Sequence, residues 1–114
     1  MINLIKFKEC SDDGNGSGRD AYARYAKGSF AKLAAVEGVV DWAGDTRGTA
    51  FGPVDWGDWD YIVKVSYPSK ERFLELFTSP EFAAANQHRV NGVERQVIIA
   101  TQEAFGPWAP AFSD

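Results

Sequence analysis

His88 is the only histidine of this chain, and histidine is the side chain whose ordinary pKa lies nearest neutral pH. Acid–base catalysis would therefore fall first to His88. The next residue, Arg89, could hold a carboxylate or phosphate through two parallel hydrogen bonds. Each has a structural alternative, because the helix dipole favours a histidine near a helix C-terminus and Arg89 could pair with Glu81, Asp60 or Glu94. Adjacent helical residues can border one pocket but cannot stack on each other.

A second group of chemically capable residues combines tryptophans with acids in a chain that is 14% aromatic. The group contains Asp41, Trp42, Asp45, Asp55, Trp56, Asp58, Trp59, Asp60 and Tyr61. One hypothesis is a pocket for a flat organic ligand, lined by Trp42, Trp59 and Tyr61, with one carboxylate such as Asp41 as base or orienting group. The other hypothesis is a dimer interface, where aromatic residues are also enriched.

Other chemistries find no support in the residue pattern. The run from Asp13 to Gly18 imitates the first half of an EF-hand loop, but Arg24 stands where a bidentate glutamate is required. The run also lacks the Gly-Lys-Ser/Thr ending of a phosphate-binding loop. One histidine and one cysteine, Cys10, disfavour a zinc site, and haem ligation would rest on His88 alone. We therefore predict no metal and no bound cofactor; hydrolase motifs are missing as well.

The length and the net charge of the chain favour a single globular domain and disfavour some kinds of partner. A chain of 114 residues fits a single domain, 1–114, that is large enough to bury a core. The net charge of −4 and the lack of a basic cluster disfavour nucleic-acid and anionic-membrane partners. No apolar run is long enough to span a bilayer, and the N-terminus does not resemble a signal peptide. With one cysteine, a cytoplasmic location is the default expectation.

The elements that must position these residues are clearest in the second half of the chain. Residues 59–67 alternate in the manner of a strand, and Pro68 ends it. Two helices should follow, one over 70–78 with an N-cap at Ser69 and one over 80–89 opened by Ser79. The β-branched run over 95–101 predicts a final strand.

The first half predicts a strand over 2–7, a helix over about 19–36 capped by Asp20 or Ser17, and a strand over 39–43. Both faces of the 2–7 strand are apolar, which favours a central position in the sheet. Gly38 should end the helix, and residues 44–58 form a long loop of the kind used for binding or partner contact. The apolar tail 103–114 is expected to pack on its own domain or on a partner subunit.

The resulting β-α-β-β-α-β order, with the second helix divided in two, predicts an α+β ferredoxin-like fold with helices on one face of an antiparallel sheet. Apolar residues on both faces of most strands indicate that the second face meets another sheet, most simply in a two-fold dimer.

At the level of motifs the chain resembles the DUF1330 family. The resemblance covers about residues 22–101 and rests on the blocks WDYIVKVSYPSKERFLELFTSPEF and HRVNGVERQVIIAT, together with Trp42-Ala43-Gly44. It implies two ferredoxin-like subunits packed sheet to sheet as a dimeric α+β barrel. The superfamily contains cofactor-independent monooxygenases and muconolactone-isomerase-like enzymes, haem enzymes and stress-related proteins, so the fold alone does not assign an activity.

Two hypotheses about function follow. In the first, a homodimer binds or transforms a small aromatic or carboxylate-bearing molecule without a cofactor, between helices and sheet. His88 would be the acid–base residue and Arg89 the anchor of an anionic group, and any enzyme would be monooxygenase- or isomerase-like. In the second, the protein is a non-catalytic dimeric module whose aromatic residues serve assembly.

Overall fold

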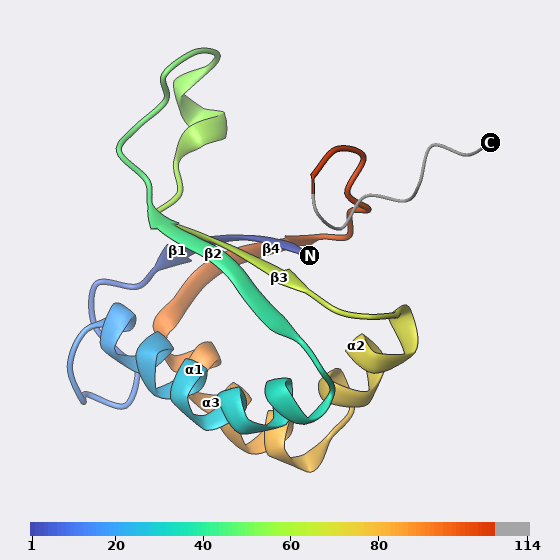
Figure 1. The fold of residues 1–114 in the computed structure, drawn as a ribbon. Coiled ribbons are helices and arrows are strands. Elements are labelled where there is room, and N and C mark those ends of the chain that lie inside the picture. Colours follow the sequence, from blue (N-terminus) through green and yellow to red (C-terminus); the bar gives the residue numbers. More distant parts are fainter. Residues whose placement is uncertain (107–114) are drawn as a thin grey trace.

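The computed structural model describes residues 1–106 and shows a four-stranded antiparallel sheet with helices on one face (Figure 1). In chain order the elements are β1 (Ile2–Phe7), α1 (Gly18–Ala35), β2 (Val39–Asp45), the short 3-10 helix η1 (Val54–Gly57), β3 (Tyr61–Ser66), α2 (Lys70–Phe77), α3 (Pro80–Gly92) and β4 (Val93–Ile99). The strands are ordered β2-β3-β1-β4. The predicted α+β ferredoxin-like class is confirmed, including the divided second helix.

Strand β1 is central, as its two apolar faces predict, and it pairs with β3 on one side and β4 on the other. On the side facing the helices, Ile5 is 0% exposed and forms the core with Val63 and Val65. The register places a second set of apolar side chains on the opposite side, where they are half-buried or exposed. This open face comprises Ile2, Leu4, Val39, Trp42, Ile62, Val97 and Ile99.

Serine caps begin all three α-helices. The Ser17 hydroxyl accepts a hydrogen bond from the Asp20 amide, and the Asp20 carboxylate accepts one from the Ser17 amide, so Ser17 is the cap of α1 and Asp20 completes a capping box. Ser69 and Ser79 cap α2 and α3 as predicted, with Pro80 at the first turn of α3. These local signals set where the helix layer begins.

Strands β4 and β2 have boundaries that differ from the prediction, and the pairing of each contains a register shift. β4 begins at Val93, two residues earlier than expected, because α3 runs directly into the strand and the pairing with β1 shifts between Lys6 and Phe7. β2 continues to Asp45, and its pairing with β3 shifts between Val40 and Trp42. The residue between them is therefore left out of the ladder as a β-bulge.

Within residues 1–106, no helix has both the length and the apolar character that crossing a membrane requires.

Candidate functional site

Eight aromatic side chains form a continuous belt between the sheet and the helices. Their ring centroids lie 5.0 to 6.1 Å apart from neighbour to neighbour. The order along the belt is Tyr61, Phe7, Tyr22, Tyr25, Phe82, Phe77, Phe73 and Tyr67. Tyr61 is the first residue of β3, and Tyr67 follows its last residue. The two ends of the belt therefore lie at the two ends of β3, and helix residues connect them.

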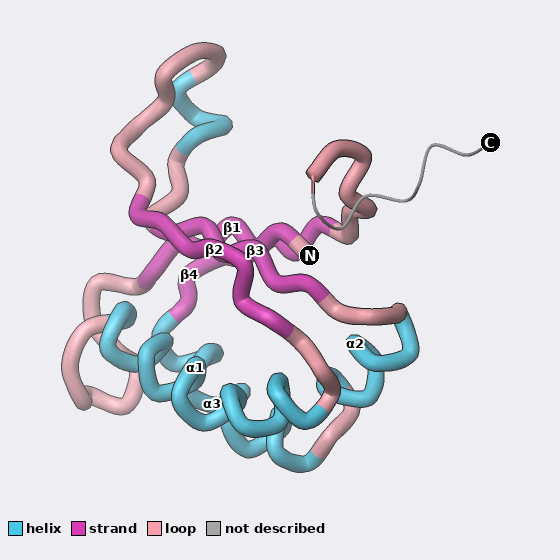
Figure 2. The backbone as a smooth tube through the Cα atoms, viewed as in Figure 1, coloured by secondary structure: helices cyan, strands magenta, loops and turns pink. Residues whose placement is uncertain are grey.

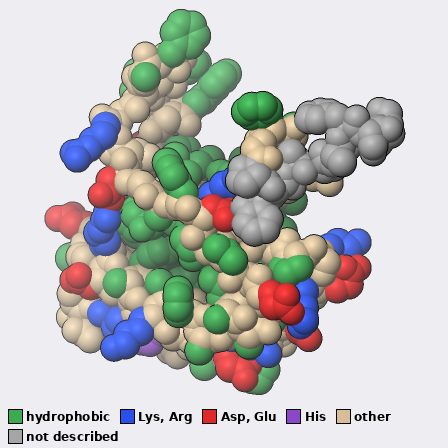
Figure 3. Space-filling view, viewed as in Figure 1, with side chains coloured by type: hydrophobic (Ala, Val, Ile, Leu, Met, Phe, Trp, Pro, Cys, Tyr) green, Lys and Arg blue, Asp and Glu red, His purple; other side chains and the backbone are tan. Residues whose placement is uncertain are grey.

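The belt does not close into a dry core. Seven of its residues are half-buried and Phe77 is 49% exposed. Figure 3 shows hydrophobic side chains gathered in a hollow between the sheet and the helices. Aromatic side chains that keep part of their surface exposed can pack against a flat ligand.

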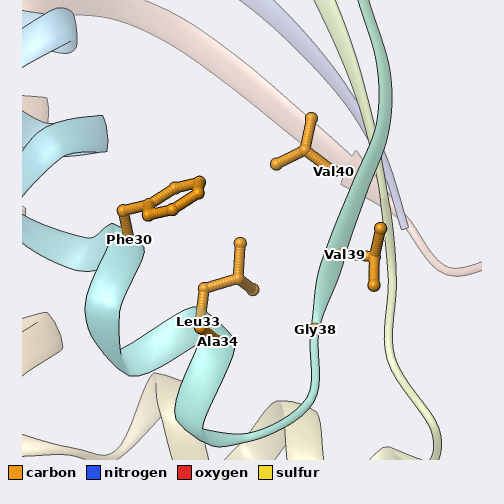
Figure 4. A pocket seen from close by; sticks show the side chains of 6 residues that line it. All are labelled: Phe30, Leu33, Ala34, Gly38, Val39 and Val40. Atoms are coloured by element: carbon orange, nitrogen blue, oxygen red, sulfur yellow. The ribbon is translucent and has the colours of Figure 1, made fainter.

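Beside the belt, a hollow of 240 Å³ opens between the C-terminal half of α1 and strand β2. Phe30 and Leu33 point toward it from the helix and Val40 from the strand (Figure 4). The other lining residues are Ala34, Gly38 and Val39. The lining is apolar, so this hollow suits a hydrocarbon part of a ligand and contributes no charged contact.

Burial shifts the acid–base behaviour of the tyrosines. Loss of solvent raises the pKa of Tyr22 and of Tyr25, while the positive charge of Arg89 acts in the opposite direction on both. Burial also raises the pKa of Tyr67 to about 12. The three phenols therefore stay neutral at physiological pH and can donate hydrogen bonds.

The raised tyrosine pKa values predict a loss of stability in alkali. A group whose pKa rises on folding stabilises the protein fully below its unfolded pKa, here 10.0 for Tyr67, and this contribution is lost as the pH rises through about 12. We expect the free energy of unfolding in urea to decline between pH 10 and pH 12. Tyr67→Phe should decline less steeply than the wild-type protein, whereas identical slopes would contradict the burial of this phenol.

Arg89 lies near the belt, where its charge acts on Tyr22 and Tyr25, and a polar network holds its side chain. Arg19 also lies over belt rings, those of Phe7 and Tyr61, but its charge is paired with Asp45. The Nε of Arg89 donates to Oδ1 of Asn86 at 2.6 Å and its Nη1 to Oε1 of Gln96 at 2.9 Å. Gln96 Nε2 donates to Oδ1 of Asn3 at 3.2 Å, and Asn3 Nδ2 donates to the Val63 carbonyl. The register places Gln96 and Asn3 on the helix-facing side of the sheet, because they pair with Ile5 and Val63.

The network holds the Arg89 side chain without neutralising its charge. None of the ion pairs within residues 1–106 includes Arg89, so it pairs with none of Glu81, Asp60 and Glu94. A guanidinium has five N–H donors, of which two are used here. A half-buried guanidinium with free donors and no carboxylate is suited to bind an anion.

The structure separates the residues predicted to line one pocket. Tyr61 belongs to the belt, but Trp42 is paired with Lys64 on the open face and is 55% exposed. Trp59 lies beneath the Arg95 guanidinium, which is 4.3 Å from its ring centre. Asp41 occupies the bulge of β2 and accepts a hydrogen bond from the Ser66 hydroxyl. The predicted grouping of Trp42 and Trp59 with Tyr61 therefore spans two faces of the sheet.

His88 lies near the loop between β1 and α1, since its charge acts on Asp13 there. Its Nδ1 is buried and has no hydrogen-bond partner in the described part of the chain. The pKa of Asp13 in that loop is lowered chiefly by the Ser11 hydroxyl, which donates to its carboxylate at 2.6 Å, and to a smaller extent by the charges of Arg24 and His88. His88 and Arg89 thus lie next to each other in α3 but have different surroundings, and the catalytic role of His88 stays a prediction.

The sequence analysis missed Gln96, Asn3 and three of the four tyrosines. Gln96 and Asn3 are isolated polar residues at inward positions of apolar strands, and this placement is the signal that could have identified them. Tyr22 and Tyr25 lie at helical spacing within α1, where the sequence pattern does not distinguish them from core residues. Among residues 1–106, no group of three or more histidine, cysteine or acidic side chains is placed to hold a metal ion.

Comparison with known proteins yields matches among solved structures. RPA0582, a protein of unknown function from Rhodopseudomonas palustris, has a TM-score of 0.78 at 30% identity over 86% of this chain and 75% of that chain. The methylated form of RPA0582 gives 0.77 at 31% identity, with 86% and 74% covered. No family model and no curated protein matches the chain.

Two more distant structures share the fold alone. At3g17210 from Arabidopsis thaliana has a TM-score of 0.59 at 13% identity, with 97% of this chain and 96% of that chain covered. A protein from Bacteroides fragilis, described as dimeric, of unknown function and with a ferredoxin-like fold, gives 0.53 at 14% identity, with 84% and 86% covered. The identity and the TM-score shared with RPA0582 are higher, and about three quarters of that chain is covered, so the chain belongs to the same family as this Rhodopseudomonas palustris protein.

Proposed function

We propose that this protein is a DUF1330-like homodimer that binds a small aromatic carboxylate between its sheet and its helices, without a bound cofactor. The observation that carries the proposal is the half-buried guanidinium of Arg89, which has free donors, no carboxylate partner among residues 1–106 and a belt of open aromatic rings beside it. An aromatic acid supplies both complementary parts, a ring for the belt and a carboxylate for Arg89.

The network behind Arg89 supports a binding role. Gln96 and Asn86 each accept from the guanidinium, so the side chain is already oriented before a ligand arrives. An oriented group loses less conformational entropy on binding than a free one. Tyr22 and Tyr25, whose raised pKa values keep them neutral, lie near Arg89 and could donate hydrogen bonds to the second carboxylate oxygen.

Turnover of the ligand would be cofactor-independent chemistry of the monooxygenase or isomerase type, with His88 as the only histidine to move a proton near neutral pH. Because His88 lies near the loop that holds Asp13, the observations favour binding over catalysis at the belt.

The dimer in this proposal would join two copies through their open faces. Seven apolar side chains share this sheet face and are half-buried or exposed, and contiguous exposed apolar surface often marks a protein–protein interface. The Bacteroides fragilis protein of the same fold is described as dimeric, which supports a dimer here. This dimer is also what the alternative function requires, a structural module without a ligand.

The ligand is tested by thermal stabilisation and calorimetry with benzoate and phenylacetate as probes. We expect both acids to raise the unfolding temperature, and Arg89→Met to weaken their binding roughly 10- to 100-fold, since it removes charge-assisted hydrogen bonds. Lys27→Met is the matched control, because Lys27 is exposed on α1 and forms no ion pair within residues 1–106. The neutral analogues benzamide and benzyl alcohol should bind weakly.

Equal binding of benzoate by the wild-type protein and by Arg89→Met would refute the role of Arg89. Equal binding of benzamide and benzoate would refute recognition of the charge. If neither acid stabilises any variant, the alternative of a structural module is favoured.

A further inference from the structure

The segment between β2 and β3 forms an arm, residues 46–60, that rises from the sheet on the side away from the helices (Figure 1). Figure 2 shows that the loop after β4 leaves the sheet on this same side, so the open face lies between two projections. The sequence predicted a long loop here, for binding or for contact with a partner. Its direction was not predictable, because it depends on how β2 and β3 sit in the sheet.

The arm exposes large apolar side chains at its far end. Phe51 is 99% exposed, Trp56 79% and Val54 77%. One exposed apolar side chain is ordinary on a protein surface, but three on one short projection indicate a contact surface. Their exposure exceeds that of every apolar side chain on the helices, where Phe30 has the highest value at 63%.

Hydrogen bonds give the arm a defined shape. At its base, the Thr46 amide donates to the Asp60 carbonyl at 3.0 Å, and the Thr46 hydroxyl donates to the Trp59 carbonyl. Further out, the Thr49 hydroxyl donates to the Val54 carbonyl at 3.3 Å, and Trp59 Nε1 donates to the Trp56 carbonyl at 3.1 Å. The two legs are thus tied together, and the apolar side chains are presented outward by an ordered backbone.

Charge and position favour a second copy of this chain as the partner. The arm rises on the same side of the sheet as the open face, and Trp42 and Gly44 of β2 lie on that face just before the arm begins. The arm also carries Arg47 and Asp55, neither of which forms an ion pair within residues 1–106. In a two-fold contact each arm meets the same surface of the other copy, so one cation and one anion per arm can be satisfied across the interface.

We propose that the arm is a clamp between subunits: when two copies join through their open faces, the arm of each packs its apolar end against the other. This inference rests on the dimer of the proposed function. It adds the apolar residues of the arm, which lie outside the sheet, to the interface between the two copies. Sheets packed face to face lie about 10 Å apart. The first leg of the arm, residues 46–53 ahead of the short helix η1, could span more than this spacing at no more than about 3.3 Å per residue.

The clamp is tested by sedimentation equilibrium over a dilution series. We expect the double variant Phe51→Ser/Val54→Ser to dissociate at least 10-fold more readily than the wild-type dimer. The control is Phe30→Ser/Val90→Ser, which changes the same residue types on the helices, where they are 63% and 53% exposed. It should dissociate like the wild-type protein. Because all four side chains are exposed, circular dichroism should show both variants folded.

An unchanged dissociation constant in the arm variant would overturn the clamp and leave the dimer standing. An equal loss in the control would also overturn it, since the effect would not be specific to the arm. If the wild-type protein is monomeric at every concentration, the dimer of the proposed function fails and the clamp fails with it.

Discussion

Gly18→Ala is expected to destabilise the protein by about 3 kcal/mol or more, since overpacking of this kind exceeds the usual range when backbone atoms are in the way. A Cβ atom at Gly18 would lie 2.1 Å from the Lys8 carbonyl oxygen and 2.5 Å from that of Gly92. Neither oxygen can move freely, because Lys8 O accepts from the Gly18 amide and Gly92 O accepts from the Lys8 amide. The start of α1, the end of α3 and the chain after β1 cross at this point without room for a side chain.

The measurement is thermal unfolding by circular dichroism, in which a loss of this size should lower the midpoint by roughly 10 to 20 °C. Gly92→Ala should behave similarly, because its Cβ would lie 2.3 Å from the Gly18 carbonyl oxygen. Gly28→Ala is the matched control in α1, where the closest atom is the Ala85 Cβ at 3.2 Å. A midpoint for Gly18→Ala within a few degrees of the control would contradict the close crossing.

Ile5→Ala should cost about 2 to 5 kcal/mol of unfolding free energy, the range for removing a buried isoleucine side chain beyond its β-carbon. Ile5 is fully buried at the centre of the sheet, where it packs with Val63 and Val65 under the aromatic belt. The strands on both sides hold it in place, so the surrounding structure has little freedom to fill the cavity.

The measurement is the free energy of unfolding in urea, compared between Ile5→Ala and Leu4→Ala, because Leu4 is the neighbouring residue on the other face of β1. Leu4 is half-buried on the open face and pairs with Ile62 and Val97. At protein concentrations low enough to keep copies apart, we expect Leu4→Ala to cost clearly less than Ile5→Ala. Equal losses would show that the two faces of β1 are equally covered, against the helix-facing core described here.

Much of the fold followed from local patterns. The apolar residues on both faces of β1 predicted its central position, and Ser17, Ser69 and Ser79 marked the helix starts. The end of α1 shows where such signals fall short. Gly38 was expected to stop the helix, but Glu37 adopts the left-handed conformation with φ 62. Gly38 instead packs closely on Leu33, because a Cβ there would lie 2.4 Å from Leu33 Cδ1 and the leucine side chain would have to move.

The candidate site was predictable only in part. Arg89 and Tyr61 were identified from the sequence, and both lie on the helix-facing side. Trp42 was assigned to the same pocket by its position in a strand, but the bulge at Asp41 and the pairing with Lys64 put it on the open face. A bulge shifts every later side chain of a strand, and nothing in the residue spacing around Asp41 reveals one.

The sequence by itself therefore determined the elements, their order and their caps, because these depend on side chains a few residues apart. Tertiary structure alone decided which residues meet. Gln96 donates a hydrogen bond to Asn3, which lies 93 positions away in the sequence. Arg89 forms hydrogen bonds with Gln96 and Asn86 and no ion pair with an acidic residue among residues 1–106. Such contacts depend on strand register and on the crossing of α1 and α3, which the packing of the whole chain sets and short-range patterns do not specify.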